Sequence, residues 1–421
     1  MHREQRHSLT RQNCTFGGHS RVGLAAFICV LVLAGLAASS HAVELDGNLW
    51  SELYVRDDGD LSHWRPYQSV QANLTAWRGS ARQRLSFHTY ARWMSDFGDK
   101  LDTDPQTSIR YAYARISELP SRTTISLGRQ FLYSTVGSSL LDGAEISYSP
   151  TKRVELQLFG GASVDTQDPQ KMRSLSDFGV AGGRLAYRHK SSTRFGLNWL
   201  YRKTDGQVSY HRLGLDVSTM VYRWRLYTRA AFNAANHRLA EILARSSYSH
   251  GRWYLSGELV YREPSVATNS VFSIIDFDRY RQGRLEARRK VWKNLSLTGR
   301  VQATLYSGDD SWSGRLGLQT RIFSLGWHFQ RGYRGVNDGV DGSAHLQLWR
   351  DWNVYAAANI SRYHIQPEVD DRTEAYSGRA GVARRFGRST DVRAEIQMMR
   401  NAVNTSDTRF YLRFNKGFSF K

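Results

Sequence analysis

Arginine and glutamate side chains recur at alternate positions along many segments of this 421-residue sequence. Arginine carries a planar fork of donors that matches carboxylate and phosphate groups, and arginines that ring a pore favour anions. If the alternating segments enclose water, the side chains opposite the apolar stripe line that lumen. This set comprises Arg92, Arg115, Arg202, Arg225, Arg229, Arg262, Arg284, Arg288, Arg300, Arg315, Arg393, Glu145, Glu155, Glu258, Glu286 and Glu395. Two roles stay open for it, namely permeation of anionic solutes and arginine–glutamate pairing that stiffens the wall.

A second charged group consists of Arg129, within Gly128-Arg129-Gln130, and Asp142. We expect an Arg129–Asp142 pair beneath an inward-folding loop that narrows the lumen. The alternative is a purely structural role, because glycines near strand ends commonly mark bulges.

Residues that perform catalysis or bind metal ions are scattered. His88, His211, His328 and His345 are expected on the polar faces of separate strands. There is no H-E-x-x-H or C-x-x-C-H motif and no G-x-S-x-G elbow, and acidic stretches such as Glu368–Asp371 lack the spacing of a calcium loop. We therefore expect no enzyme activity, no metal site and no cofactor.

The first 42 residues have the three parts of a secretory signal peptide. Four arginines precede a single apolar run, and Ser40-His41-Ala42 places small residues at the −3 and −1 positions of a cleavage site. A retained membrane anchor is the alternative. Both cysteines, Cys14 and Cys29, lie in this segment, so cleavage after Ala42 leaves 379 residues without any cysteine. A disulfide framework or a cysteine nucleophile is then excluded.

Composition narrows the class of protein further. Aromatic residues make up 12% of the chain, which excludes a disordered protein, and the rest of the chain lacks the long apolar runs of helical membrane proteins. Without its first 42 residues the chain keeps 54 basic and 37 acidic side chains. The basic residues are dispersed, without a run of five, which favours an anion-attracting lumen or contact with anionic lipid over a nucleic-acid partner.

Apolar and polar side chains alternate over segments of nine or more residues throughout 43–421. Leu45, Leu49 and Leu53 share one face while Asn48 and Glu52 share the other, and the same pattern recurs at 85–93, 195–202, 297–305 and 392–398. A period of two indicates β-strands with two unlike faces.

Long and short connections alternate between these segments. Long polar links are expected at 57–65, 96–107, 162–176, 263–278, 332–339 and 364–372, and short ones at 78–82, 149–153, 249–252, 321–323, 350–351 and 387–389. This alternation is typical of an antiparallel membrane barrel. We expect an all-β fold, a single closed barrel of about 22 strands (range 18–26) that occupies 43–421 as one domain.

A membrane barrel fits this pattern better than a soluble protein. A tilted strand of about 9–11 residues crosses a bilayer, and lipid on the outside lets the apolar faces do without a protein partner. Aromatic residues expected near segment ends suit interfacial girdles: Trp93, Tyr201, Trp253, Tyr261, Trp327, Trp349, Trp352 and Tyr363. A soluble propeller or β-helix is the alternative, but it requires a repeated sequence motif that is absent.

Two short stretches carry a resemblance to known proteins. Ile125 to Gln130, followed by Leu141-Asp142-Gly143-Ala144 and Ser149-Pro150, resembles a hairpin of Gram-negative outer-membrane porins and alginate-export-like barrels. The final strand, ending at Phe420, resembles the aromatic terminal strand read by the barrel-assembly machinery, although Lys421 follows it. The match covers some 25 residues in the hairpin, and the remaining chain matches by pattern alone.

We therefore expect an outer-membrane channel that allows passive, anion-favouring diffusion of small solutes. The expected partners are outer-membrane lipid, lipopolysaccharide and the barrel-assembly machinery. A scaffold that sheathes a multihaem cytochrome, or a barrel that exports a polysaccharide, is the first alternative. A hydrolase built into the barrel wall is the second.

Overall fold

The computed structural model describes residues 44–57, 62–78, 83–98, 106–165, 169–263, 279–333, 335–364, 373–402 and 406–420. The predicted signal peptide and its cleavage site lie outside the described residues, as do most of the links predicted at 96–107, 263–278 and 364–372. No helix in the described ranges is long and apolar enough to cross a membrane.

The chain forms 22 strands in one sheet. The first eleven are β1 (Glu44–Asp57), β2 (Ser62–Arg78), β3 (Arg84–Met94), β4 (Gln106–Leu119), β5 (Thr123–Ser134), β6 (Gly137–Tyr148), β7 (Val154–Ser163), β8 (Gly179–His189), β9 (Thr193–Thr204), β10 (Gln207–Val221) and β11 (Trp224–Asn233). The others are β12 (Arg238–His250), β13 (Trp253–Arg262), β14 (Tyr280–Trp292), β15 (Leu295–Leu305), β16 (Asp310–Gln319), β17 (Phe323–Gly332), β18 (Val336–Trp349), β19 (Trp352–His364), β20 (Thr373–Phe386), β21 (Thr390–Arg400) and β22 (Asp407–Phe420). A single 3₁₀ turn, η1 (Pro120–Arg122), and a short helix, α2 (Leu175–Phe178), complete the described elements.

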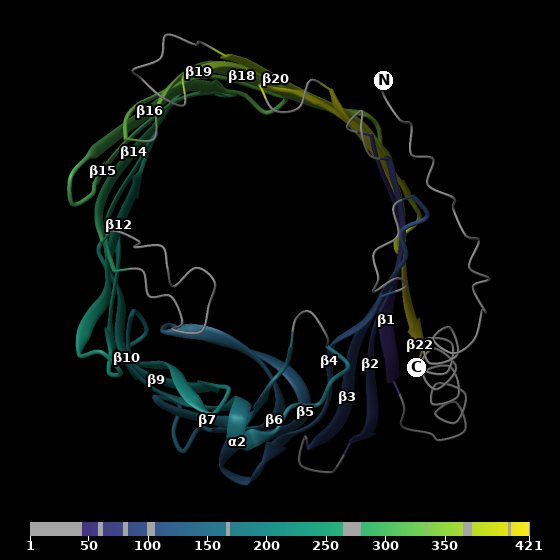
Figure 1. Cartoon of the computed structure of the whole chain (residues 1–421), viewed down its shortest axis with the longest axis vertical. Coiled ribbons are helices and arrows are strands. Elements are labelled where there is room, and N and C mark those ends of the chain that lie inside the picture. The colour runs from purple at the N-terminus through teal and green to yellow at the C-terminus, as the bar shows by residue number, and fades with distance from the viewer. Residues whose placement is uncertain are drawn as a thin grey trace, which may run out of the picture. The chain divides into compact units, whose positions relative to one another are not determined.

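The sheet is closed on itself. Each strand pairs antiparallel with the next, and β1 pairs with β22 from Leu45 opposite Phe420 to Asp57 opposite Thr408. Figure 1 shows the resulting ring of strands. Closure leaves no open edge with unsatisfied backbone groups. The predicted fold, a closed antiparallel barrel with 22 strands, is confirmed.

Two of the predicted long links are shorter than expected. Arg65 lies inside β2, which begins at Ser62, and Gly339 lies inside β18, which begins at Val336. The side chains at these positions are polar, so the alternation did not indicate that hydrogen bonding between the strands continues there. Hydrogen bonding between strands needs no apolar side chains, so the strands extend beyond the alternating apolar segments.

Short turns gather at one end of the barrel, called here the short-turn end, because even-numbered strands run into them. The connections after the odd-numbered strands form the opposite, long-loop end. Each of the nine described short turns carries at least one exposed lysine or arginine: Arg122, Lys152, Arg153, Lys190, Arg223, Arg252, Lys293, Arg321, Arg350 and Arg388. Asp351 is the single carboxylate within those nine turns.

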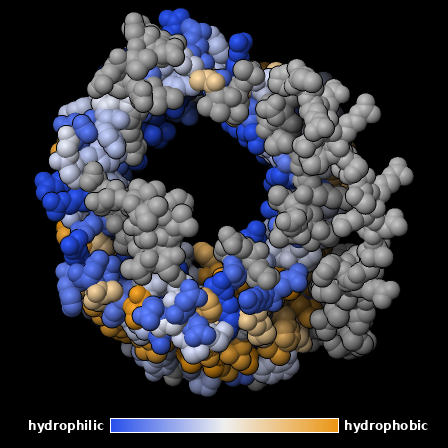
Figure 2. Space-filling model, viewed as in Figure 1, coloured by the Kyte–Doolittle hydropathy of each residue, from blue (hydrophilic) through white to orange (hydrophobic). Residues whose placement is uncertain are grey.

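The two faces of the sheet differ in polarity. Cross-strand partners lie on the same side of a sheet. Following these pairs from strand to strand around the ring therefore assigns each strand residue to one of the two faces. One face carries large exposed apolar side chains, such as Leu259 (67% exposed) and Leu285 (64% exposed), and the other carries most of the charges within the strands. Figure 2 shows hydrophilic residues around the opening and hydrophobic ones gathered on the outer surface.

Aromatic residues lie mainly on the outer face. Arg289 lies 5.0 Å above the ring of Trp253, and Arg384 lies 4.9 Å above Trp352, both close to the short-turn end. Two of the aromatic positions predicted as girdle residues were wrong. Tyr363 is opposite Asn337 on the inner face, and Trp327 lies in the middle of β17. Sequence alternation alone does not give the height of a residue along the strand.

Candidate functional site

All sixteen residues predicted to line the lumen lie on the inner face. The register shows this along neighbouring strands, since Glu258 is opposite Arg284, Arg284 opposite Gln302, and Arg300 opposite both Glu286 and Arg315. The alternation that forms the strands also directs these side chains, because successive residues of a strand point to opposite faces.

Carboxylates hold several of these arginines in place. Glu241 Oε1 accepts from Arg229 at 2.5 Å and from Arg262 at 3.2 Å. Glu258 accepts from Arg245 and approaches Arg284 at 3.7 Å. Each carboxylate therefore neutralises one guanidinium and leaves the positive charge of the other.

Further pairs follow around the wall. Arg300 donates to Glu286 at 2.9 Å, Arg194 approaches Glu155 at 3.3 Å, and Arg315 donates to Asp341. Pairs this exposed contribute about 0.2–1 kcal/mol each to stability, so their main effect is to fix where the charges lie. The wall-stiffening role expected for part of the set thus has a structural basis.

The remaining predicted arginines have no carboxylate partner within the described residues: Arg115, Arg202, Arg225, Arg288 and Arg393. Arg288 lies 5.4 Å from the ring centroid of Tyr254, and Arg115 lies 5.1 Å from that of Tyr113. Contact with an aromatic face positions a guanidinium and leaves its charge in place. The inner face therefore keeps an excess of positive charge.

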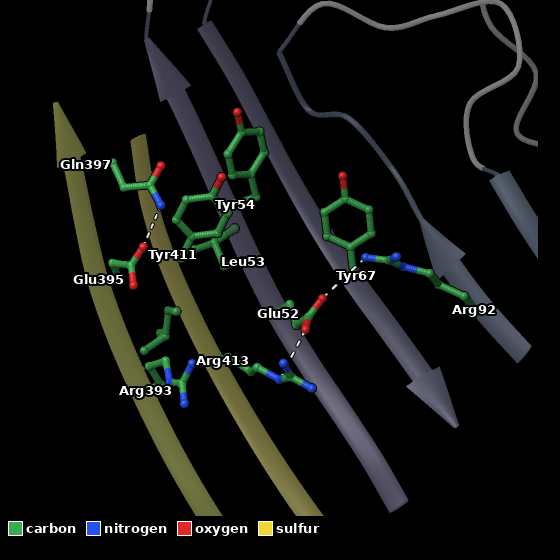
Figure 3. Close-up of a pocket in the computed structure, with 11 residues that line it drawn as sticks. Glu52, Leu53, Tyr54, Tyr67, Arg92, Arg393, Glu395, Gln397, Tyr411 and Arg413 are labelled. Carbon is green, nitrogen blue, oxygen red and sulfur yellow. Dashed lines mark hydrogen bonds and ion pairs between the residues drawn. The ribbon is translucent and has the colours of Figure 1, made fainter. Parts of the chain in front are cut away.

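A hollow on the inner wall spans the seam where β22 closes against β1. It has a volume of about 410 Å³ and includes Arg92, Arg393 and Arg413 together with Glu52 and Glu395. In Figure 3, Glu52 lies between Arg92, at 3.3 Å, and Arg413, at 3.2 Å, while Glu395 accepts from Gln397 at 2.5 Å. Three tyrosines, Tyr54, Tyr67 and Tyr411, line the same hollow. It presents a net positive charge beside aromatic faces.

The β5–β6 hairpin leaves the wall and folds into the lumen. Pairing of β5 with β4 ends at Arg129, and pairing of β6 with β7 ends at Leu141, so residues 130–139 form strand pairs only within the hairpin. Figure 1 shows this hairpin inside the ring of strands, beside β9 and β10. Gly128, at the bend, has φ +125°, and a Cβ there would lie 2.4 Å from the carbonyl oxygen of Ala112. Only glycine fits this bend.

Apolar packing fixes the hairpin against the inner wall. Leu132, Val136 and Leu141 are buried in one cluster with inner-face side chains of the neighbouring strands: Phe159, Val180, Leu200, Ala231 and Ala240. Burial of a leucine or valine side chain contributes about 1.5–3 kcal/mol. The cluster therefore holds the hairpin in its folded-in position.

Polar contacts hold the tip in register. Thr135 donates to Asp216 at 2.8 Å, Tyr210 donates to the carbonyl oxygen of Val136, and Arg202 donates to the carbonyl oxygen of Ser138 at 2.8 Å. Asn198, fully buried, donates to Asp216 at 2.7 Å. The opposite face of the hairpin leaves Phe131 and Tyr133 exposed, at 60% and 67%.

The structure brings Arg129 and Asp142 together at the base of this hairpin. Arg129 donates to both carboxylate oxygens of Asp142 at 2.8 Å and also to the carbonyl oxygens of Ile109 and Pro169. A bidentate pair of this kind is geometrically specific. It ties β4, the hairpin and the β7–β8 connection together at the point where the hairpin turns inward. Its effect on permeation stays a prediction.

Of the four histidines expected on polar faces, one was placed wrongly. His211 is opposite Tyr201 on the outer face, and its ring packs against the Tyr201 ring at 5.6 Å. The pairing of β10 with β9 is irregular between Val208 and Tyr210, and this shifts the face on which the following residues lie. No feature of the sequence marks this irregularity. His88, His328 and His345 lie on the inner face.

His88 takes part in a chain of polar contacts. Its Nε2 atom lies 2.9 Å from Ser86 Oγ, and its Nδ1 atom lies 2.8 Å from Asn73 Oδ1. Asn73 donates in turn to Asp46 at 3.0 Å. This is the arrangement of a nucleophile, a base and a group that orients the base.

Sequence reasoning missed several residues that hold the hairpin, above all Tyr210, Asp216 and Asn198. The sequence did contain an indication of the hairpin's position. The alternation that places the arginines on the polar face also places Phe159, Val180 and Leu200 there. Apolar side chains on a face that lines water indicate that another part of the chain covers them.

Comparison with known proteins gives likeness in fold only. No family model matches the chain, and no curated protein matches its sequence. Among solved structures, Pseudomonas aeruginosa OccK9 (OpdG) is 11% identical with a TM-score of 0.45, over 90% of this chain and 98% of that one. Acinetobacter baumannii OccAB3 is 10% identical with a TM-score of 0.44, over 90% and 99%. The translocation pore of the P pilus usher PapC is 11% identical with a TM-score of 0.42, over 90% and 100%. Likeness at this level transfers no residue role to this chain.

Proposed function

We propose that this chain is a porin-like channel of the bacterial outer membrane through which small solutes, preferentially anions, diffuse passively. The observation that carries the proposal is a closed barrel whose inner face holds more arginines than carboxylates. An apolar outer face suits lipid, and an inner wall of fixed charges suits a selective aqueous path. Export by the signal peptide, contact with lipid and lipopolysaccharide, and insertion by the barrel-assembly machinery through β22 belong to the same proposal.

The inward hairpin favours a channel over a sheath for a separate protein. A barrel that surrounds a multihaem cytochrome needs an unobstructed interior, whereas the β5–β6 hairpin is packed against the inner wall by its own apolar cluster. The constriction is therefore supplied by this chain itself. A narrowed lumen with fixed charge is the arrangement that selects small solutes.

Single-channel recording in a planar bilayer tests the proposal. We expect discrete conductance steps and, in a potassium chloride gradient, a reversal potential that shows preference for chloride. The triple variant R225Q/R288Q/R393Q removes three unpaired inner arginines and should reduce that preference. The matched control R331Q/R362Q removes outward charges next to Asp338 and Glu374 and should leave it unchanged. A silent membrane, or cation preference in the wild type, contradicts the proposal.

A second candidate function rests on the Ser86–His88–Asn73 chain of contacts. In a serine hydrolase, His88 would take the proton of Ser86 Oγ as that oxygen attacks an ester carbonyl, and would return it to the leaving alcohol. Water would then release the acid from Ser86. Arg115, directly opposite Ser86 on the next strand, supplies a cation beside the site.

Labelling with a fluorophosphonate probe decides this second candidate. If Ser86 is a nucleophile, the probe labels the folded wild type and the inner-face control S313A. It does not label S86A. Hydrolysis of a short-chain ester should fall with S86A and H88A alike. Absence of labelling in the folded wild type removes the hydrolase candidate and leaves the channel proposal untouched.

A further inference from the structure

A hollow at the short-turn end is lined by five basic side chains. Arg122 comes from the turn between β4 and β5, Lys152 and Arg153 from the turn between β6 and β7, and Arg188 and Arg194 from facing ends of β8 and β9. Its volume is about 200 Å³. Three consecutive hairpins thus contribute cations to one small space.

Glu155 is the single carboxylate that lines this hollow, and it lies 3.3 Å from Arg194. The other four cations have no carboxylate partner within the described residues. At the long-loop end several arginines are paired with carboxylates, as in Arg65 with Asp96 and Arg238 with Glu263. Unpaired cations are common to the short turns, and this hollow differs from the other turns because its cations line one small space.

The strand register adds unfavourable charge at the same place. Arg188 is directly opposite Arg194 on the inner face, and like charges that face each other across two strands are destabilising. The backbone of this corner is fixed, because Arg188 N–H donates to the carbonyl oxygen of Arg153 at 2.7 Å and Thr151 Oγ accepts from the N–H groups of Arg153 and Val154. The cations cannot separate by moving the turn, so an anion in the hollow relieves their repulsion.

We propose that this hollow binds a phosphate group. A phosphate group carries up to two negative charges and accepts hydrogen bonds in several directions, which matches guanidinium groups that converge from three hairpins. A single carboxylate would leave most of these donors unused. The volume accommodates the phosphate with a small attached group, which is the headgroup of a phospholipid or a small phosphorylated solute. The inference does not require that the barrel conducts.

Isothermal titration of the detergent-solubilised full barrel with inorganic phosphate tests the site at constant ionic strength. We expect saturable binding to the wild type, at least tenfold weaker binding to R153Q/R188Q, and at least tenfold weaker binding of acetate than of phosphate to the wild type. The matched control is R223Q/R252Q, which removes two basic side chains from other short turns at the same end. It should bind phosphate within twofold of the wild type. Equal loss in both double variants means that phosphate responds only to the general charge of this end, and this overturns the site.

A second measurement distinguishes the source of the phosphate group. Native mass spectrometry of the barrel released from vesicles of phosphatidylglycerol and phosphatidylcholine should show retained phosphatidylglycerol if the ligand is a lipid headgroup. Binding of glycerol phosphate without retained lipid assigns the site to a soluble solute. If neither probe binds and inorganic phosphate does not titrate, the inference is wrong. A barrel that binds phosphate but does not conduct overturns the proposed channel and leaves this site intact.

Discussion

At the scale of single residues, each inner carboxylate controls how much arginine charge an ion meets. Glu241 is the clearest case, because it is shared by Arg229 and Arg262 and is nearly buried. A carboxylate shared in this way leaves the cluster with one net positive charge. In the proposed channel, selectivity should therefore depend on the carboxylates as much as on the arginines themselves.

E241Q should raise anion preference. The variant raises the net charge of the cluster from one to two, and a unit charge acts on an ion about 4 Å away with about 1 kcal/mol in water, so the chloride-to-potassium permeability ratio should rise by roughly two- to fivefold. Reversal potentials in asymmetric potassium chloride measure this ratio. E374Q, an outward carboxylate beside Arg362, is the matched control. An unchanged ratio in E241Q would mean that the permeating ions do not pass this cluster.

Asp96 is a residue whose charge stabilises the long-loop end. Its carboxylate is almost fully buried, and it accepts from Arg65 at 2.6 Å, from His63 at 2.8 Å and from the Gly98 N–H at 3.1 Å. Burial by itself raises the pKa of this carboxyl, but the hydrogen bonds outweigh it and hold the pKa below its ordinary value. The ionised form is thus favoured by folding.

Acid should selectively weaken this contact. Because the folded-state pKa is depressed, the stabilisation is complete above the ordinary aspartate pKa and is lost as pH falls through the lower folded value. The difference in unfolding free energy between wild type and D96N, measured by tryptophan fluorescence in denaturant, should therefore be constant near neutrality and shrink as the pH is lowered below the ordinary aspartate pKa. A difference in unfolding free energy between wild type and D96N that grows on acidification would contradict this prediction.

At the scale of elements, the β5–β6 hairpin lies folded against the inner wall, and a glycine of that wall permits its position. A Cβ at Gly214 would lie 2.3 Å from Val136 Cγ1 at the hairpin tip. The bare backbone of β10 thus lets the tip lie against the wall. An added side chain at this position meets the hairpin first, because the next nearest atom, the carbonyl oxygen of Ala230, lies 3.2 Å from the added Cβ.

G214L should displace the tip and widen the pore. Forcing a larger side chain into a packed site costs about 1–3 kcal/mol, which is comparable with the burial of one apolar side chain of the hairpin. Mean single-channel conductance should increase, with a wider spread of current levels. G378L adds the same side chain where the nearest atom is 3.9 Å from the added Cβ, and it should conduct like the wild type. Conductance that falls in G214L would show that the hairpin does not limit the current.

Sequence pattern predicted the elements and the inner face, but not this hairpin. Alternation shows on which side of its strand a residue lies. The number of strands and the inward orientation of Arg284 and Glu258 could therefore be predicted directly. Ion-pair partners such as Glu241 with Arg262 depend on the register between neighbouring strands, which the alternation within each strand does not give. The inward fold depends on Gly128 with φ +125° and on contacts between residues far apart in the chain, as between Thr135 and Asp216. Local pattern does not encode such contacts.

At the scale of the whole molecule, the two faces of the sheet are suited to different surroundings. The outer positions of β14 read Arg281, Gly283, Leu285, Ala287 and Arg289, so apolar side chains lie between two outward charges near the strand ends. The inner positions of the same strand carry Arg284 and Glu286. Lipid around the middle of the strand and water inside the barrel account for both patterns, and no soluble packing partner is needed.

L285R tests this division at a central outward position. An arginine that faces lipid at the bilayer midplane costs about 2–4 kcal/mol, whereas S256R places the same side chain opposite Glu286 on the inner face and avoids contact with lipid. Unfolding in denaturant from vesicles should show L285R destabilised by that amount and S256R by less than half of it. Equal destabilisation would mean that both faces meet the same medium. A chain without its first 42 residues that is monodisperse in buffer without detergent would lead to the same conclusion, because apolar side chains such as Leu259 and Leu285 would then have to be covered by protein.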